Sequence, residues 1–274
     1  MPEGPEIRRA ADHLSAALAG RKARLVEFAF PTLHAAAARL SGQTVTRVEP
    51  RGKAMLTHFS GGETIYSHNQ LYGEWRLLGI GESPQASLQV RLAIHTDESV
   101  AVLYSASEIE VWNTADLQRH PYLRRLGVEL LSPETRVAHV AQQVNDQRWA
   151  RKGVAGALLD QGFLAGVGNY LRSEILFAAR IEPNARIGEL TPAGRQALAR
   201  AALRLTRQSY RTGGITNDVA IAKRMQAAGA AFGRYRHWVF DRAGEPCHRC
   251  GTLIRRDDVG GRGLFWCMRC QAKK

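Results

Sequence analysis

Hydrophobic and polar positions follow different periods in successive parts of the chain. After the first few residues, apolar side chains recur at helical spacing from Ile7 to Leu18, and Gly20 follows as a stop signal. This pattern predicts one helix at the start of the chain. From residue 24 to about residue 106 the period is two, in short runs separated by Gly and Ser; the runs are 25–30, 44–48, 54–59, 63–67, 74–78, 88–95 and 100–104. Many short strands at close spacing predict a β-sandwich.

The β pattern stops after Ser132-Pro133, and helical periods take its place. Helices are predicted over 134–144, 154–159, 170–179 and 192–210, the last with Thr191 as N-cap and Pro192 at the first helical position. Residues 211–236, rich in Ala, Gly and basic residues, are expected to form a flexible basic linker. The chain is therefore predicted to be a multidomain α+β protein with domains 1–132, 133–237 and 238–272.

Length and charge narrow the class of protein. The 274 residues fit two or three domains. Lys and Arg number 38 against 25 acidic residues, which gives a net charge of +13. Such a basic chain usually binds a polyanion, most often nucleic acid, although the charge can also serve solubility alone. No apolar run approaches the roughly 18 residues of a membrane span, and no signal peptide is recognisable. We expect a cytoplasmic protein, and a monomer because nothing in the sequence indicates an interface.

Four cysteines near the C-terminus have the spacing of a metal site. They follow the pattern C-x2-C-x16-C-x2-C, and they are Cys247, Cys250, Cys267 and Cys270. Each C-x2-C pair can present two thiolates from one tight turn, and two such turns complete a tetrahedral site for Zn2+. Four thiolates leave no open coordination position, so we expect one structural zinc that folds a segment too small for its own core.

The first residues carry a possible nucleophile. Removal of Met1 before the small residue Pro2 is expected, and it would leave a free secondary amine on Pro2. An α-amino group has a pKa near 8, so it is partly unprotonated and nucleophilic at neutral pH. Its attack on a sugar C1′ would give an iminium and allow β-elimination of the 3′ phosphate, with Glu3 placed to move a proton. The plainer alternative is an exposed chain end.

Three loops have the composition of DNA-contacting segments. In residues 68–73, Leu71 and Tyr72 could wedge into a base stack while Gln70 fills the vacated position, or both could be core residues of a hairpin. In the glycine-rich segment 161–170, Asn169 and the free N–H groups of a helix start suit a phosphate oxygen, or Asn169 is simply the N-cap. Arg262 lies in a Gly-Gly-Arg-Gly tip, where it could reach a groove or remain a solvated turn residue.

These segments together resemble one family. The opening Pro-Glu-Gly-Pro-Glu, Arg51-Gly52-Lys53 on an early strand, the turn 162–169 and the four-cysteine finger resemble the formamidopyrimidine-DNA glycosylase/endonuclease VIII family over essentially the whole chain. The opening segment and the contiguous Gln70-Leu71-Tyr72 are similar to the endonuclease VIII branch. Segment 211–234 is longer and richer in Ala than that branch predicts. The resemblance implies an N-terminal helix and β-sandwich, a helix–two-turns–helix domain and a zinc finger, with DNA bound between the halves.

The resemblance also implies a role for each matching residue. Pro2 would be the Schiff-base nucleophile, Glu3 the general acid/base and Lys53 the proton donor in β-elimination. Asn169 and Arg262 would grip the phosphates beside the lesion, and Arg262 would assist δ-elimination. Arg125 matches a DNA contact of the family. Gln70, Leu71 and Tyr72 would fill the gap left by base flipping.

The implied protein is a bifunctional DNA glycosylase/AP lyase of base-excision repair. Its expected partner is double-stranded DNA with damaged bases or abasic sites, and its expected place is the cytoplasm, at the nucleoid. The endonuclease VIII branch implies oxidised pyrimidines as substrates. Two alternatives remain at this point: an oxidised-purine (formamidopyrimidine/8-oxoguanine) glycosylase of the same family, and a zinc-ribbon nucleic-acid-binding protein without catalysis.

Overall fold

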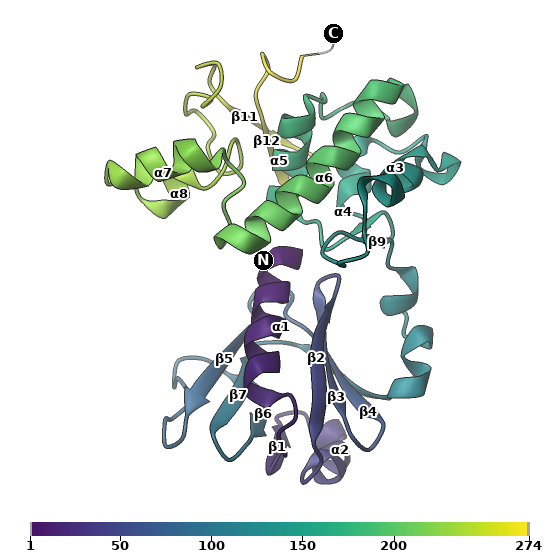
Figure 1. The fold of residues 1–274 in the computed structure, drawn as a ribbon, viewed down its shortest axis with the longest axis vertical. Coiled ribbons are helices and arrows are strands. Elements are labelled where there is room, and N and C mark those ends of the chain that lie inside the picture. Colours follow the sequence, from purple (N-terminus) through teal and green to yellow (C-terminus); the bar gives the residue numbers. More distant parts are fainter. Residues whose placement is uncertain (1, 273–274) are drawn as a thin grey trace. The chain divides into compact units, whose positions relative to one another are not determined.

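A computed structural model describes residues 2–272 of the chain (Figure 1). Contacts between residues divide it into two compact units. The first contains Pro2 and Glu6–Arg124; the second contains Glu3–Pro5 and the chain from Arg125 onward. The three predicted domains stay a prediction, because the zinc-finger segment and the helical segment group together in the second unit.

The first unit contains helix α1 and two four-stranded antiparallel sheets. Helix α1 covers Gly4–Leu18, of which the first two residues group with the second unit. One sheet has the order β1 (Leu25–Phe28), β6 (Val90–His95), β7 (Ser99–Tyr104), β5 (Glu74–Gly79). The other has the order β2 (Val45–Arg51), β3 (Ala54–Phe59), β4 (Glu63–His68), β8 (Glu108–Asn113). Side chains of α1 and of both sheets share one apolar core, so the prediction of an N-terminal helix with a β-sandwich is confirmed.

The β3–β4 region is buried on both faces, in contrast to the alternating burial of an edge strand. All six side chains of β3 are buried. The face of β4 away from the core is covered by the 3-10 helix Thr114–Arg119 and the residues after it: the hydroxyls of Thr64 and Thr114 are 2.8 Å apart, and the rings of Tyr66 and His120 are 4.1 Å apart. The aromatic side chains of this covering layer include His120 and Tyr122, and Tyr122 reaches the turn between β2 and β3.

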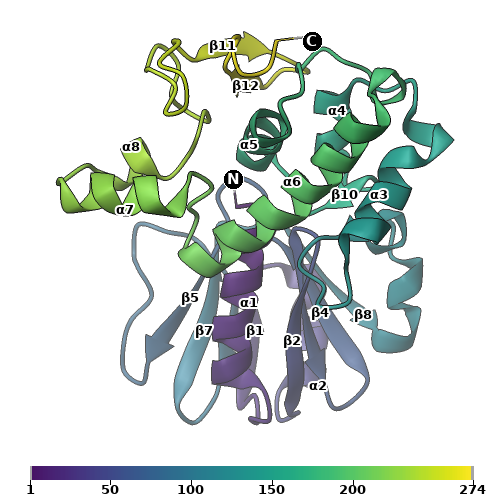
Figure 2. The same cartoon turned by 45° about the horizontal axis from the view of Figure 1, so that its top comes forward.

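The second unit is mainly helical. Its helices are α3 (Val137–Asn145), α4 (Val154–Leu159), α5 (Asn169–Ala179), α6 (Pro192–Thr212), α7 (Val219–Ala227) and α8 (Phe232–Tyr235). A two-stranded parallel pair joins β9 (Val128–Glu129) to β10 (Leu164–Ala165), and the hairpin β11 (Arg255–Asp258) and β12 (Gly263–Trp266) belongs to the C-terminal finger (Figure 2). Helices α3 to α6 share an apolar core that also receives Leu264 from the finger.

Local signals explain where the long helix α6 begins and ends. Thr191 has extended backbone angles, and its hydroxyl accepts a hydrogen bond from the N–H of Gly194 at 3.1 Å. Pro192 supplies the first helical position, and Gly213 ends the helix with a positive φ of 72°. The predicted N-cap and start of this helix are confirmed, and its end lies two residues beyond the predicted one.

The prediction of a flexible linker over residues 211–236 is wrong. This segment contains α7 and α8, and the side chain of Asp218 caps α7 by accepting from the N–H groups of Ala220 and Ile221. The Ala-rich run has high helix propensity, and a good N-cap precedes it. The periodic pattern also missed β8 and the short helix α2 (His34–Leu40). None of the helices within residues 2–272 is both long and apolar enough to cross a membrane.

Candidate active site and zinc centre

The start of helix α5 holds the carboxylate of Glu3. One oxygen accepts hydrogen bonds from the N–H groups of Gly168 at 2.7 Å and Leu171 at 3.2 Å, and the other accepts from Tyr170 at 2.8 Å. Glu3 is 2% exposed. The donors are unpaired N–H groups of a helix N-terminus, which favours negative charge. The Glu3 carboxylate is therefore fixed in one position by backbone groups.

The glycines before α5 make room for this carboxylate. A Cβ atom on Gly168 would lie 2.4 Å from the side-chain carboxyl carbon of Glu3. Gly166 has a φ of 86° and its carbonyl accepts from the N–H of Gly4 at 2.8 Å. The expectation that the free N–H groups here receive a phosphate is therefore wrong for the three that Glu3 occupies. Asn169 is also not the N-cap, because that position belongs to Gly168.

Asn169 instead links α5 to the tip of the C-terminal hairpin. Its side-chain N–H donates to the carbonyl of Gly263 at 2.9 Å, and its carbonyl oxygen accepts from Arg172 at 2.6 Å. Arg172 also donates to the carbonyls of Val259 and Arg262, both at 3.3 Å. The structure thus joins Glu3, Asn169 and the backbone of Arg262 through one end of α5.

Arg172 was not predicted from the sequence. Its side chain is fully buried, and burial together with the charge of Arg262 lowers its pKa to about 10, against the opposing effect of Glu3 and Asp258. The guanidinium therefore remains charged at neutral pH while it binds three parts of the site. The only available signal was its place three residues after Asn169 on the same helix.

The predicted contact residues Arg262 and Arg125 both have exposed side chains. Arg262 lies in the turn between β11 and β12, where Gly260 and Gly261 have positive φ values of 63° and 72°. Arg125 lies beside the glycine-rich turn, since a Cβ on Gly162 would be 3.0 Å from the Arg125 carbonyl oxygen. An exposed arginine can contact a phosphate or simply remain solvated. The DNA-binding roles of Arg262 and Arg125 therefore stay predictions.

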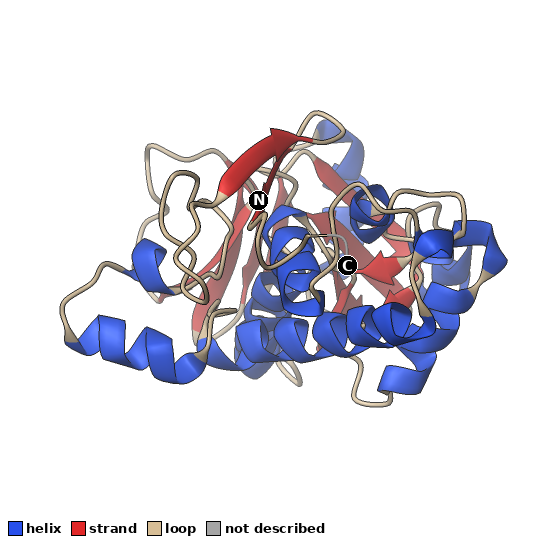
Figure 3. Cartoon of the chain, turned by 90° about the horizontal axis from the view of Figure 1, so that it is seen from above, coloured by secondary structure: helices blue, strands red, loops and turns tan. Residues whose placement is uncertain are grey.

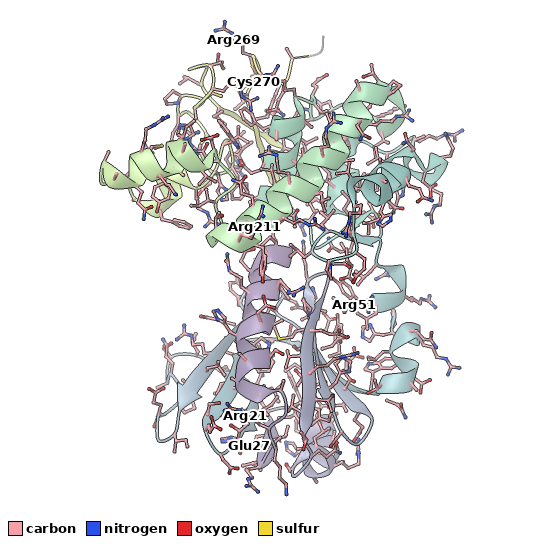
Figure 4. All side chains as sticks on the ribbon, in the orientation of Figure 1. Arg21, Glu27, Arg51, Arg211, Arg269 and Cys270 are labelled. Atoms are coloured by element: carbon pink, nitrogen blue, oxygen red, sulfur yellow. The ribbon has the colours of Figure 1, made fainter. Side chains whose placement is uncertain are left out.

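The four cysteines form a metal centre in the second unit. Their Sγ atoms all lie within 4.8 Å of one another, and Sγ of Cys250 is 3.5 Å from Sγ of Cys267. Four thiolates about 2.3 Å from a tetrahedral Zn2+ are separated by about 3.8 Å, so the cluster fits one zinc ion. Figure 4 shows Cys270 and the neighbouring Arg269 at the end of the finger. The predicted structural zinc is confirmed as the metal that this donor set fits.

In the first unit, Lys53 lies in a two-residue turn. Residues Arg51 and Ala54 pair across the β2–β3 hairpin, and Gly52 between them has a φ of 61°. Lys53 was expected on a strand; it is instead the second residue of this turn, and it is buried. Its N–H donates to the hydroxyl of Tyr122 at 2.9 Å, so the aromatic layer behind β4 holds its backbone in place.

The loop after β4 has two exposed apolar residues and one tethered polar residue. Leu71 is 56% exposed and Tyr72 is 81% exposed, so the alternative in which they belong to the core is wrong. Gln70 has a left-handed φ of 51°. Its amide oxygen accepts from Ser107 at 2.6 Å and its amide nitrogen donates to Glu108 at 3.2 Å. Sequence reasoning missed Ser107 and Glu108, which are 37 and 38 residues away from Gln70.

His68 also contributes to this loop. Its Nδ1 accepts from the N–H of Gln70 at 3.1 Å, and its ring packs edge-on against Tyr122, 5.6 Å away. Burial lowers the pKa of His68, and the charge of Lys53 acts in the same direction against that of Glu108. A neutral His68 is the form that can accept this hydrogen bond. The role of Pro2, which is half-buried, stays a prediction, and Met1 lies outside the described residues.

Comparison with known families defines the class of this protein. Residues 1–107 match the formamidopyrimidine-DNA glycosylase N-terminal domain, residues 126–220 match the H2TH domain of the same glycosylase, and residues 244–273 match the zinc finger found in FPG and IleRS. The matches cover, in chain order, the β-sandwich apart from β8, the helical part as far as the start of α7, and the cysteine finger. The chain belongs to the formamidopyrimidine-DNA glycosylase/endonuclease VIII family and is a DNA glycosylase/AP lyase of base-excision repair.

Within this family, the chain is similar to proteins named Endonuclease 8. It is 46% identical to the one from Escherichia coli O17:K52:H18 and 45% identical to the one from Shigella sonnei, in each case over 271 residues that cover 99% of this chain and 100% of the relative. The predicted resemblance to the family is therefore confirmed.

Solved structures confirm the fold. The chain superposes on Lactococcus lactis Fpg (MutM) in a complex with DNA that contains N7-benzyl-Fapy-dG, with a TM-score of 0.82, 21% identity, and coverage of 99% of this chain and 100% of that chain. A structure of MutM with DNA that contains carbocyclic 8-oxo-G gives a TM-score of 0.82 at 20% identity, with the same coverage.

Proposed function

We propose that this enzyme binds damaged double-stranded DNA, removes oxidised pyrimidines through a Schiff base on Pro2, and then cuts the strand by β,δ-elimination. The observation that carries the proposal is the Glu3 carboxylate, which three backbone N–H groups hold in place beside the residue that would supply the nucleophile.

The chemistry begins at the nitrogen of Pro2. After removal of Met1, this secondary amine attacks C1′ of the damaged nucleotide, a C–N bond forms, and the bond from C1′ to the base breaks. Glu3 moves a proton during this exchange. Transfer of a proton to O4′ then breaks the C1′–O4′ bond and opens the sugar ring, which gives the iminium. Loss of the C2′ proton from this iminium expels the 3′ phosphate, with Lys53 as the proton donor that assists this β-elimination, and a second elimination assisted by Arg262 expels the 5′ phosphate.

Binding would rest on the exposed residues of the two units. Leu71 and Tyr72 are available to wedge into the base stack, and Gln70 would replace the flipped nucleotide. Asn169 and Arg262, joined through Arg172, would hold the phosphates beside the lesion, with Arg125 as a further contact. The four cysteines would hold one Zn2+ that keeps the finger folded.

The test is mass spectrometry of the purified protein before and after borohydride treatment with abasic-site DNA. Borohydride reduces an iminium to a stable amine, so the expected result is an adduct on the N-terminal peptide that begins with Pro2. Retention of Met1, or an adduct on another residue, would contradict the proposed nucleophile. The complete absence of an adduct and of strand cleavage would favour a zinc-ribbon protein that only binds nucleic acid.

The substrate branch needs a separate measurement. Single-turnover excision from duplexes that carry thymine glycol should be faster than excision from duplexes that carry 8-oxoguanine. The contiguous Gln70-Leu71-Tyr72 supports this order. A marked preference for 8-oxoguanine would instead place the enzyme among the oxidised-purine glycosylases of the same family.

The cysteines also bear on the cellular compartment of the enzyme. Reduced thiolates at the zinc site favour a reducing compartment. We therefore expect the enzyme to work in the cytoplasm, as a monomer associated with the nucleoid. Colocalisation of a tagged protein with the chromosome is the measurement that checks this expectation.

A further inference from the structure

Helix α6 carries a large positive charge for which the proposed chemistry has no use. Its 21 residues include five arginines and no acidic residue. The helix lies in front of α5 in Figure 1 and along one side of the second unit in Figure 3. Its arginines fall into two groups that differ in what the guanidinium contacts.

Two of the five arginines bind backbone carbonyls of the same unit. Arg195 donates to the carbonyls of Leu190 at 3.2 Å and Gly188 at 3.1 Å. Arg207 donates to the carbonyl of Thr135 at 2.7 Å and to that of Ser132 at 3.2 Å. These guanidinium groups hold the loops around α6, and we assign them no ligand.

The other three arginines, Arg200, Arg204 and Arg211, have exposed side chains. At 100° per residue, they lie within about 40° of arc on the helix, and the span from the first to the last is about 16 Å. Within residues 2–272, none of the three forms an ion pair with an acidic side chain, and Arg204 makes one long hydrogen bond of 3.4 Å to Gln208. Figure 4 shows Arg211 near the C-terminal end of α6.

The opposite face of α6 explains why this stripe points outward. The buried side chains of the helix, which include Leu198, Ala202 and Leu205, face the core shared with α3 and α5. At 100° per residue, these three side chains lie roughly 140 to 200° around the helix from Arg200. Packing therefore fixes the rotation of α6 and leaves three exposed guanidinium groups in one line at the surface, with no acidic partner among residues 2–272.

We propose that Arg200, Arg204 and Arg211, the α6 stripe, bind the sugar–phosphate backbone of duplex DNA that carries no lesion. Three aligned cations with no acidic partner are complementary to a polyanion with evenly spaced charges. Phosphates along one strand follow one another every 3.4 Å of helix axis, so a stripe of about 16 Å faces roughly five of them. Guanidinium groups suit phosphate oxygens because they donate two parallel hydrogen bonds. The inference extends the proposed function, since it assigns a surface for undamaged DNA.

The stripe would act before the chemistry. Contacts to phosphates carry no sequence information and give binding that depends strongly on salt. They would hold the enzyme on undamaged duplex during the search for a lesion. They would not change the rate of base excision once the enzyme is saturated with damaged DNA.

The experiment compares two triple variants of the full chain. In the first, Arg200→Gln, Arg204→Gln and Arg211→Gln remove the stripe without introducing a poor helix former. In the second, Arg21→Gln, Arg24→Gln and Arg39→Gln remove the same net charge from arginines that pair with Glu98, Asp97 and Glu63 at the surface of the first unit. Binding to an undamaged 20-base-pair duplex is measured from 50 to 300 mM salt, and strand cleavage of an abasic-site duplex is measured at saturating enzyme.

For the stripe variant, the slope of log affinity against log salt should fall by about two to three, and affinity at 50 mM salt should fall about tenfold or more. Its single-turnover cleavage rate should equal that of the wild type, and the triple Arg→Lys variant should restore most of the slope. Equal slopes in the two Gln variants would overturn the proposal. Binding of both variants to anionic vesicles and to RNA is measured in parallel. A stripe variant that keeps its affinity for DNA and loses affinity only for vesicles or RNA would also overturn the proposal. Failure of the wild type to cleave abasic DNA would instead contradict the proposed function.

Discussion

Helix α5 binds one buried carboxylate at its start and carries another in its second turn. Glu3 comes from the first residues of the chain, and its carboxylate accepts hydrogen bonds from three backbone N–H groups at the start of the helix. Glu174 belongs to the second turn and accepts from the N–H groups of Trp238, Val239 and Phe240 and from the hydroxyl of Thr216. Both are almost inaccessible. Burial and the number of hydrogen bonds therefore do not distinguish them; what differs is the neighbour in the chain, which is Pro2 for Glu3.

The comparison indicates that one helix can hold groups of the proposed chemistry at its first turn and stabilise the fold at its second. The first turn of α5 brings together Glu3, Asn169 and, through Arg172, the tip of the finger. The following turns pack Phe177 against the finger core and fix the segment 238–240 through Glu174. Perturbations of the first turn should change activity more than stability, and perturbations of the second should do the opposite.

The largest effect should follow removal of zinc, because the finger contacts both turns of α5. A structural zinc contributes roughly 10 kcal/mol or more to folding of such a module. Chelation, or replacement of Cys247, Cys250, Cys267 and Cys270 by Ser, should abolish DNA binding and strand cleavage. Circular dichroism and proteolysis should show that the β-sandwich remains folded. Full activity of the four-Ser variant would contradict a role for the finger.

Glu3→Gln should reduce base excision by roughly 10²- to 10⁴-fold, the range for loss of a general acid/base. Gln has the same shape, but one carboxylate oxygen becomes an NH2 group that faces backbone N–H donors, so some loss of stability accompanies the effect. The measurement is single-turnover excision of thymine glycol, together with the melting temperature. A variant that melts far earlier but excises normally would identify Glu3 as a structural residue.

Glu174→Gln should have the opposite balance. The side chain is fully buried, and its two oxygens accept four hydrogen bonds, so an NH2 group in place of one oxygen leaves donors facing each other. The expected loss is about 3 kcal/mol in the free energy of unfolding of the second unit. Urea denaturation checks it, with excision measured on the fraction that remains folded. Unchanged stability would remove the contrast with Glu3.

Arg172→Lys should act mainly on binding. A lysine keeps the positive charge but lacks the planar fork that reaches Asn169 and two carbonyls of the finger tip at once. Affinity for a duplex with an uncleavable abasic analogue should fall about tenfold, while the excision rate at saturation changes less. The matched control is Arg195→Lys, since Arg195 also binds backbone carbonyls but lies away from the finger tip. Equal losses in the two variants would rule out a specific role.

The smallest effect concerns pH. His237 lies against Thr216, whose hydroxyl donates to Glu174, and burial, with Arg236 and Arg242, lowers the pKa of His237 well below its ordinary value. The unfolded chain takes up a proton near pH 6.5 and the folded chain does not, so stability is lost as pH falls below 6.5. The slope should approach about 1.4 kcal/mol per pH unit. In the His237→Asn variant, the free energy of unfolding measured by denaturation should depend less on pH between pH 7 and pH 5. An unchanged slope would show that His237 is not the source of the pH dependence.

Much of this molecule follows from local patterns in its sequence. Periodicity placed α4, α5 and α6 within a few residues, and the cysteine spacing identified the metal centre. The alternating runs located most strands of the sandwich. These features depend on neighbours in the chain, which a sequence displays directly.

The features that were missed depend on residues far apart in the sequence. Arg172 contacts carbonyls 87 to 91 residues away, and the Ser107–Glu108 pair reaches Gln70 across a gap of about 37 residues. The anion that occupies the start of α5 was expected to come from DNA, although the chain supplies its own through Glu3. The composition of the segment indicated a helix start with free N–H donors. Only the fold shows that the Glu3 carboxylate accepts their hydrogen bonds.

Gly168 gives the site a particular vulnerability to mutation. A Cβ atom there would lie 2.4 Å from the side-chain carboxyl carbon of Glu3, so an added methyl group and the carboxylate exclude each other. Every missense change of a glycine codon introduces at least that one carbon. We therefore expect any replacement of Gly168 to displace the Glu3 carboxylate, and so to impair the proton transfer proposed for Glu3 without altering any group that takes part in the proposed reaction.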